Sequence, residues 1–249
     1  MTGPPRSPLS LLRSCTLADA VQEEVLCLIK EGALRAGERL GEVEFAARLG
    51  VSRATIREAF RGLGESRLLA LEKNRGAVVR AISPAEADEL YEVRAGLDAM
   101  AGARLARRIT AAELAELEGM LGGLAACGAA RDVAAYYPLN VAFHDRIVAM
   151  AGNATLLRIY RRVINLTHLL RRTSFADPES FAASAEEHEA IVAALATRDA
   201  RAAAAAMRRH VRSGYARMRS GRSAAAGGAA MAGGAAGGAA GELVLDVGV

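Results

Sequence analysis

Three histidines and an asparagine are the residues of this chain whose types and spacing could bind a metal ion. The chain contains four histidines, which are His144, His168, His188 and His210. Asn140 precedes His144 by four residues, so the two share one face of a helix, and His188 and His210 lie in two other helical segments. Imidazole nitrogens with one oxygen ligand suit Zn²⁺, Ni²⁺, Co²⁺ or Mn²⁺. Spacing alone favours the simpler interpretation, in which these are isolated core or surface histidines.

A second group of residues, within Gly50–Leu63, has the types that read DNA. This stretch reads GVSRATIREAFRGL. Gly50 suits the turn that ends one short helix, and Ser52 stands where the N-cap of the next helix belongs. Apolar residues recur at helical spacing on one face, and the opposite face carries the polar residues Arg53, Thr55, Arg57 and Arg61. Arginine can bind guanine bidentately in a major groove. The alternative is an ordinary amphipathic surface helix.

The flanking segments predict a winged helix-turn-helix. An amphipathic helix over 17–31, a loop over Ala33–Leu40 and a short helix over Glu42–Leu49 precede the stretch. Two segments of β character, Leu68–Leu71 and Ala77–Ile82, follow it around a turn. This order of helices and hairpin is that of a winged helix-turn-helix. The basic turn that forms the wing tip, with Lys73, Arg75 and Gly76, could lie against phosphates.

Composition agrees with a helical, DNA-binding protein. Of 249 residues, 52% are hydrophobic, 24% charged and only 4% aromatic, which favours Ala/Leu-rich helix packing over a β-sandwich. The net charge is +4, and residues 1–81 hold 13 Lys and Arg against 10 Asp and Glu. Three cysteines without a C-x-x-C pair argue against a disulfide framework or a Cys₄ zinc site. The sequence has no signal-peptide pattern and no apolar run of the ~20 residues that a membrane helix needs, which predicts a cytoplasmic protein.

The sequence divides into four parts of a mainly α protein. A proline-containing arm over 1–15 precedes the winged helix-turn-helix over 16–82. Residues 83–219 predict an all-α antiparallel helical bundle, with helices at 84–108, 111–127, 132–151, 154–173, 180–196 and 199–218. Residues 220–249 are rich in Ala and Gly and predict a flexible tail.

The first part resembles the DNA-binding domain of the GntR family of bacterial transcription regulators. The resemblance rests on GALRAGERLGEVEFAARLGVSRATIREAFRGL and on the wing sequence NRGAVV, and it covers about 16–82. It implies that a set of residues on the recognition helix faces DNA, namely Ser52, Arg53, Thr55 and Arg57, and that Gly76 lets the wing approach closely. The sequence departs from the family pattern at Val43, at Ala36 and at the pair Ala54-Thr55, which bears on operator preference.

The second part is similar to the FCD domain, the helical effector domain of FadR-type GntR regulators. The motifs are YEVRAGLDAMAGARLA, NVAFHDRIVAMAGNATL, EEHEAIVAAL and RRHV. In that domain three histidines and an Asp or Asn four residues before the first one bind a metal, and the matching positions are Asn140, His144, His188 and His210. Arg94 lies in the first motif, where it could bind the carboxylate of an effector or form an ion pair within the bundle. Asp98 replaces a frequent Glu, and His168 lies outside the pattern.

These observations predict a ligand-responsive transcriptional regulator, a repressor rather than an enzyme. We expect a homodimer that binds a pseudo-palindromic operator and senses a small carboxylic acid with Arg94 and a divalent transition metal, Zn²⁺ first and Ni²⁺ or Mn²⁺ as alternatives. Two other interpretations stay open. The bundle could be a metal-free dimerisation module, or a helical metalloenzyme fused to a DNA-binding domain.

Overall fold

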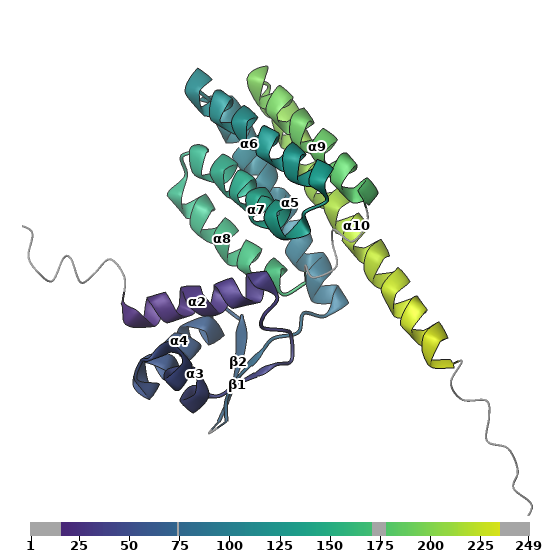
Figure 1. The fold of residues 1–249 in the computed structure, drawn as a ribbon. Coiled ribbons are helices and arrows are strands. Elements are labelled where there is room, and N and C mark those ends of the chain that lie inside the picture. The colour runs from purple at the N-terminus through teal and green to yellow at the C-terminus, as the bar shows by residue number, and fades with distance from the viewer. Residues whose placement is uncertain (1–15, 74, 171–177, 235–249) are drawn as a thin grey trace, which may run out of the picture.

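The N-terminal half of the computed structural model is a winged helix-turn-helix (Figure 1). The structure describes residues 16–73, 75–170 and 178–234. The first elements are α2 (Leu17–Glu31), β1 (Arg39–Leu40), α3 (Glu42–Leu49), α4 (Arg53–Glu65), β2 (Leu69–Glu72) and β3 (Gly76–Val79). The predicted helices and hairpin are confirmed, and the predicted arm over 1–15 lies outside the described residues.

The sheet has one strand more than the hairpin that the sequence predicts. Its order is β1-β3-β2, and both neighbours run antiparallel to β3. Arg39 pairs with Val78, whereas the sequence predicts a loop throughout Ala33–Leu40. Two residues are too few to show the alternation that marks a strand in a sequence. The strand forms because the edge of β3 offers it unpaired backbone groups.

Helix α4 begins and packs as its sequence predicts. Gly50 adopts a left-handed conformation with φ 65°, and the Ser52 side chain accepts a hydrogen bond from the Thr55 backbone N–H. The face that is apolar in the sequence is buried in the core of the domain. Burial of that face leaves Arg53, Arg57 and Arg61 exposed on the opposite side of the helix.

The C-terminal half is a bundle of helices. Its elements are α5 (Pro84–Ala106), α6 (Ala111–Ala130), α7 (Val133–Met150), α8 (Ala154–His168), α9 (Pro178–Ala196) and α10 (Ala200–Gly234). Polar residues cap the first turns of α5 to α8, and Ser83, Thr110, Asp132 and Asn153 each accept a backbone hydrogen bond there. Helices α5 and α10 lie side by side (Figure 1). Gly102 permits this, because a Cβ there would lie 2.8 Å from Met207 Cγ.

The ends of two helices differ most from the prediction. Helix α8 ends at His168 rather than at 173, and residues 171–177 lie outside the described part. Helix α10 continues to Gly234, whereas the sequence predicts a flexible tail from residue 220. Alanine has the highest helix propensity, so the alanines beyond 220 extend an established helix despite the glycines between them. Residues 235–249, the rest of the predicted tail, are not described.

Helix α8 joins the two halves of the molecule. Its Leu166 is buried with the apolar residues of the winged helix-turn-helix rather than with those of the bundle. Arg162, also on α8, donates to the backbone carbonyl of Glu65 at the end of α4, at 2.9 Å. The winged helix-turn-helix therefore contacts the bundle through an apolar contact and a hydrogen bond. Within the described residues, no helix combines the length and the apolar character needed to cross a membrane.

Candidate functional site

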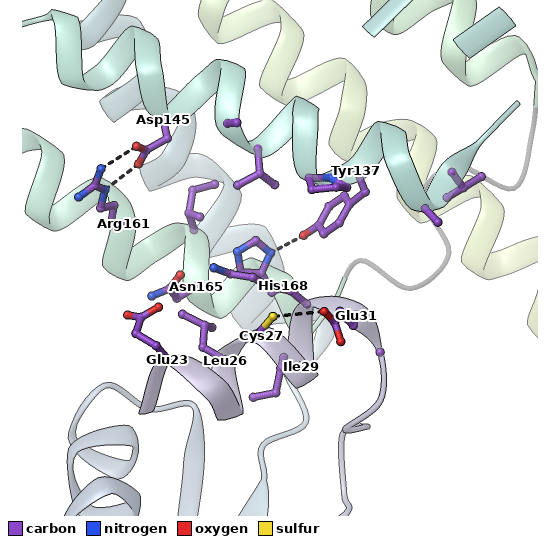
Figure 2. Close-up of a pocket in the computed structure, with 18 residues that line it drawn as sticks. Glu23, Leu26, Cys27, Ile29, Glu31, Tyr137, Asp145, Arg161, Asn165 and His168 are labelled. Atoms are coloured by element: carbon purple, nitrogen blue, oxygen red, sulfur yellow. Dashed lines mark hydrogen bonds and ion pairs between the residues drawn. The ribbon is translucent and has the colours of Figure 1, made fainter. Parts of the chain in front are cut away.

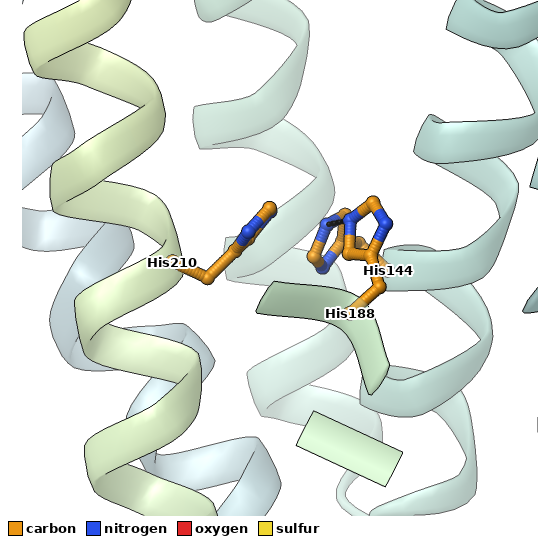
Figure 3. Close-up of side chains that lie close together, drawn as sticks. All are labelled: His144, His188 and His210. Carbon is orange, nitrogen blue, oxygen red and sulfur yellow. Dashed lines mark hydrogen bonds between the residues drawn. The ribbon is translucent and has the colours of Figure 1, made fainter. Parts of the chain in front are cut away.

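The three histidines that the sequence singles out meet inside the bundle. His144 comes from α7, His188 from α9 and His210 from α10, and Figure 3 shows the three rings directed toward one another. One ring nitrogen of each lies within 4.8 Å of the others. The Nε2 atoms of His144 and His188 are 3.2 Å apart. All three side chains are at least nine-tenths buried. The interpretation as isolated histidines is therefore wrong.

The donor set fits a metal ion. Two imidazole nitrogens that share one cation at about 2.0–2.1 Å lie roughly 3.0–3.4 Å from each other, which includes the separation of His144 and His188. Asn140, one turn before His144 on α7, is also buried. Its Oδ1 is buried without a hydrogen-bond partner among the described residues. An unsatisfied buried acceptor costs about 1–3 kcal/mol, and a cation held by the histidines would offset that cost.

A buried ion pair lies beside the histidines. Arg94 and Asp98 are 2% and 0% exposed, and Arg94 Nε lies 3.7 Å from Asp98 Oδ2. Asp98 Oδ1 is 3.8 Å from His144 Nδ1. Both side chains project from α5 and share one face, because they are four residues apart. The structure thus brings Arg94 to the cluster, and it also forms the intra-bundle ion pair that the sequence left as an alternative.

A second carboxylate contacts the cluster from α9. Glu187 Oε2 accepts a hydrogen bond from His210 Nδ1 at 2.8 Å, and Arg217 donates to both oxygens of Glu187 at 2.7 and 2.8 Å. Burial raises the pKa of Glu187, but the hydrogen bonds from Arg217 and His210 outweigh it and lower that pKa to about 2. Burial also lowers the pKa of His210, and the charge of Arg94 lowers it further, against the opposite effect of Glu187.

The sequence alone assigns no role to three of these residues, which are Asp98, Glu187 and Arg217. Each carries a weak positional signal, because Asp98 follows Arg94 by four residues, Glu187 adjoins His188, and Arg217 follows His210 by two helical turns. Such spacings are common on helices, so the sequence does not show that these side chains meet. Their contacts form because α5, α9 and α10 pack together.

The fourth histidine lies elsewhere, at the junction of the two halves. His168 ends α8, is 6% exposed, and its Nδ1 contacts the hydroxyl of Tyr137. The pair lines a groove between α2 and the helices α7 and α8 (Figure 2). The volume of this groove is about 940 Å³. At one end of the groove, Arg161 donates to both oxygens of Asp145 at 2.7 Å. His168 therefore stays outside the metal cluster, as the sequence predicts, although it is buried.

Acid should destabilise the metal-free protein below about pH 6.5. The pKa of His210 is lowered from its ordinary 6.5, so in this range the unfolded chain binds a proton that the folded chain does not. The free energy of unfolding therefore decreases as the pH is lowered, by at most about 1.4 kcal/mol per pH unit for one such group. Protonation of Glu187 lowers the free energy of unfolding in a similar way, but only between pH 4.5 and about pH 2. Thermal unfolding at pH 8, 7, 6 and 5 measures this.

His210→Gln is the matched variant for the acid effect. It removes the titrating imidazole, so its melting temperature should fall less steeply between pH 6.5 and 5 than that of the wild type. Equal slopes for the two proteins would contradict the assignment to His210. Because metal ligands must be neutral imidazoles, the wild type should also release bound metal over the same range.

The residues of α4 that the sequence predicts to face DNA lie together at the surface. Ser52, Arg53 and Arg57 are exposed, and Thr55 is half-buried beside the Ser52 hydroxyl. Arg57 donates to both oxygens of Glu42, at 3.2 and 2.8 Å, and Arg53 lies 3.9 Å from the same carboxylate. Both arginines therefore contact a carboxylate of α3.

The wing lies across a cleft from these arginines. Arg53, Arg57, Arg61 and Arg75 line one hollow between α3, α4 and the sheet, and Lys73 is exposed at the end of β2. Gly76 has φ 83°, and a Cβ there would lie 2.2 Å from the Leu40 carbonyl oxygen. The pairing of β1 with β3 thus requires glycine at this position, which is a structural reason separate from any approach to DNA.

Comparison with known proteins assigns the chain to a family. Residues 17–79 match the bacterial regulatory proteins of the gntR family, and residues 89–213 match the FCD domain. The chain belongs to the GntR family. It is therefore a DNA-binding transcriptional regulator rather than the metalloenzyme of the alternative interpretation.

Related GntR regulators cover most of the chain. It is 31% identical over 201 residues to the "Probable D-xylose utilization operon transcriptional repressor" of Paenarthrobacter nicotinovorans, across 80% of this chain and 88% of that protein. It is 32% identical over 183 residues to the "Nta operon transcriptional regulator" of Aminobacter aminovorans, across 73% of this chain and 84% of that protein. The solved structure of E. coli McbR/YncC has the same fold, with a TM-score of 0.76 over 82% of this chain and 98% of that one, at 21% identity.

Proposed function

We propose that this GntR regulator is a homodimeric repressor that releases its operator when a small carboxylic acid binds at a metal ion inside the FCD bundle. The observation that carries the proposal is the buried group of three histidines with an unsatisfied Asn140 oxygen, next to a buried arginine. Repression agrees with the name of the xylose-operon relative. Since a dimer presents two recognition helices, the operator should be pseudo-palindromic.

The metal would be held by His144, His188 and His210, with Asn140 as an oxygen ligand. Three nitrogen ligands and one neutral oxygen suit Zn²⁺, with Ni²⁺ or Mn²⁺ as alternatives. A cation bound there supplies a positive centre to which a carboxylate can bind. The chain's own contribution is to hold neutral imidazoles in a buried site and to place the Arg94 guanidinium beside them.

Arg94 is the residue that we assign to the effector. Its planar guanidinium can donate two parallel hydrogen bonds to a carboxylate. Arg94 Nε lies 3.7 Å from Asp98 Oδ2, which is an ion-pair distance and longer than a hydrogen bond. An acid that binds more tightly to one conformation of the bundle than to the other shifts the equilibrium toward that conformation. Helix α8, which contacts both halves, is placed to carry that change to α4.

DNA binding by the full-length protein tests this function. The operator is first selected from random DNA, and its affinity is then measured with and without added Zn²⁺ and a panel of short mono- and dicarboxylic acids. At least one acid should weaken operator binding of the metal-loaded protein by about 5- to 150-fold, the usual range of allosteric coupling. If every acid of the panel leaves affinity unchanged while metal is bound, the effector part of the proposal is wrong.

Arg94→Lys should separate the effector from the metal. Lysine keeps a positive charge beside Asp98, so it avoids the cost of a buried unpaired carboxylate, but it cannot make two parallel hydrogen bonds. We expect unchanged metal content and an acid affinity that is lower by about tenfold, the loss of one charged hydrogen bond. Elemental analysis measures the metal content, and calorimetric titration with the active acid measures the affinity. Arg104→Lys, an exposed position on the same helix, is the control. Loss of metal from Arg94→Lys would contradict the assignment.

A further inference from the structure

One carboxylate outside the predicted ligand set contacts a predicted ligand and an arginine together. Glu187 lies on α9 beside His188, and its side chain bridges to α10. Its Oε2 accepts a hydrogen bond from His210 Nδ1 at 2.8 Å, and Arg217 donates to both of its oxygens. His210 and Arg217 lie on one face of α10, because seven residues are about two helical turns. The carboxylate is therefore fixed between two residues of the same helix.

This contact determines which nitrogen of His210 carries a hydrogen. A carboxylate paired with a guanidinium is an acceptor only, so the hydrogen of the contact must belong to His210 Nδ1. In a neutral ring, Nε2 is then the nitrogen with a free lone pair. Figure 3 shows the His210 ring directed toward His144 and His188. The ring centroid of His210 is 4.7 Å from that of His144 and 4.5 Å from that of His188.

We propose that Glu187, held by Arg217, is a positioning residue that prepares His210 to bind the metal through Nε2. The proposal rests on the proposed function, in which these histidines bind a metal. Carboxylates that accept a hydrogen bond from a ligating histidine fix its tautomer and its orientation. The other carboxylate near the cluster, Asp98, is 3.8 Å from His144 Nδ1, beyond hydrogen-bond distance. Glu187 is therefore the carboxylate to which the structure assigns this role.

Zinc affinity of the full chain tests the assignment. Metal-free protein is titrated with Zn²⁺ against a chromogenic chelator. Glu187→Ala should lower zinc affinity by about 10- to 100-fold, the usual effect of removing such a partner. Glu186→Ala removes the same charge from an exposed neighbouring position and should leave affinity unchanged. Arg217→Met, which frees the carboxylate but leaves it in place, should cause a smaller loss in the same direction, and it serves if Glu187→Ala does not fold.

Two further measurements distinguish positioning from a simple link between α9 and α10. In the His210→Ala background, Glu187→Ala should cause no further loss of affinity, because its effect acts through His210. Nitrogen NMR of the metal-free protein should show His210 with its hydrogen on Nδ1, and Glu187→Ala should move that hydrogen to Nε2. Equal losses with and without His210, or an unchanged tautomer in Glu187→Ala, would overturn the proposal.

Zinc binding by the wild type and by Glu187→Ala distinguishes an error about Glu187 from an error about the metal site. If zinc binds and depends on the three histidines, but Glu187→Ala binds zinc as the wild type does, only the role of Glu187 is wrong. If the wild type binds no zinc, the metal function itself is wrong. In that case the hydrogen bonds of Glu187 serve the packing of α9 against α10.

Discussion

Replacing His144, His188 or His210 by alanine is expected to weaken metal binding, so that the purified variant holds less than one metal ion per chain, and to lower the melting temperature measured with metal. Each substitution removes one of three converging nitrogens. A metal that binds only the folded state at a hundred times its dissociation constant stabilises that state by about 2.7 kcal/mol, and this contribution is lost with the metal. Elemental analysis of the purified variants and thermal unfolding with and without Zn²⁺ measure the two effects together.

The fourth histidine provides the control for this result. His168 is also buried, but it lies at the groove between α2 and α7, away from the cluster, so His168→Ala should retain the metal. Asn140→Asp should bind zinc more tightly than the wild type, because a carboxylate adds a negative charge at the same position on α7. If His168→Ala loses metal as the other variants do, or if the wild type gains no stability from Zn²⁺, Ni²⁺ or Mn²⁺, a metal-free dimerisation bundle replaces the metal site.

Arg57→Ala is expected to weaken binding to the selected operator by ~1–3 kcal/mol and to relax the preference at one base pair. The side chain is exposed on α4, and Glu42 holds it at two of its nitrogens in the free protein. A guanidinium held in one orientation can bind guanine bidentately without first losing rotamer freedom. Fluorescence anisotropy with operator DNA and with a scrambled duplex, at one fixed salt concentration, measures affinity and specificity.

Matched variants separate base reading by Arg57 from a general effect of charge. Arg104→Ala removes an exposed positive charge from α5 and should leave operator affinity unchanged. Lys73→Ala and Arg75→Ala at the wing should weaken operator and scrambled DNA alike and reduce the salt dependence. An Arg57→Ala protein with wild-type operator affinity would show that α4 is not the recognition helix.

The fold could be predicted where local signals are strong. The Ser52 cap, the glycine turn before it and the apolar periodicity of α4 all act within a few residues, so the sequence predicts this helix correctly. Strand β1 depends on pairing with β3, which is distant in the sequence, and its two residues carry no pattern. The end of α10 depends on the balance between alanine and glycine propensities, which composition alone did not resolve.

The site could be predicted only in part, because spacing within one helix is visible in the sequence and packing between helices is not. Asn140 and His144 share a helix, so their common face follows from a spacing of four residues. The approach of α9 and α10 to α7 is tertiary, so spacing does not predict it, and only the family resemblance implies that His188 and His210 join His144. Asp98, Glu187 and Arg217 have types and spacings that occur on many surface helices, so their contacts with the cluster emerge only when the helices are packed.

Leu166 should make the winged helix-turn-helix and the bundle unfold together. Leu166 belongs to the bundle by sequence but completes the apolar core of the winged helix-turn-helix. Opening either half therefore exposes apolar surface of the other, so the chain should unfold as one calorimetric unit rather than as two. The excised segment 1–82 would lack this side chain and the Arg162 contact at the end of α4. It should melt at a lower temperature than the same residues do in the full chain, whatever its oligomeric state.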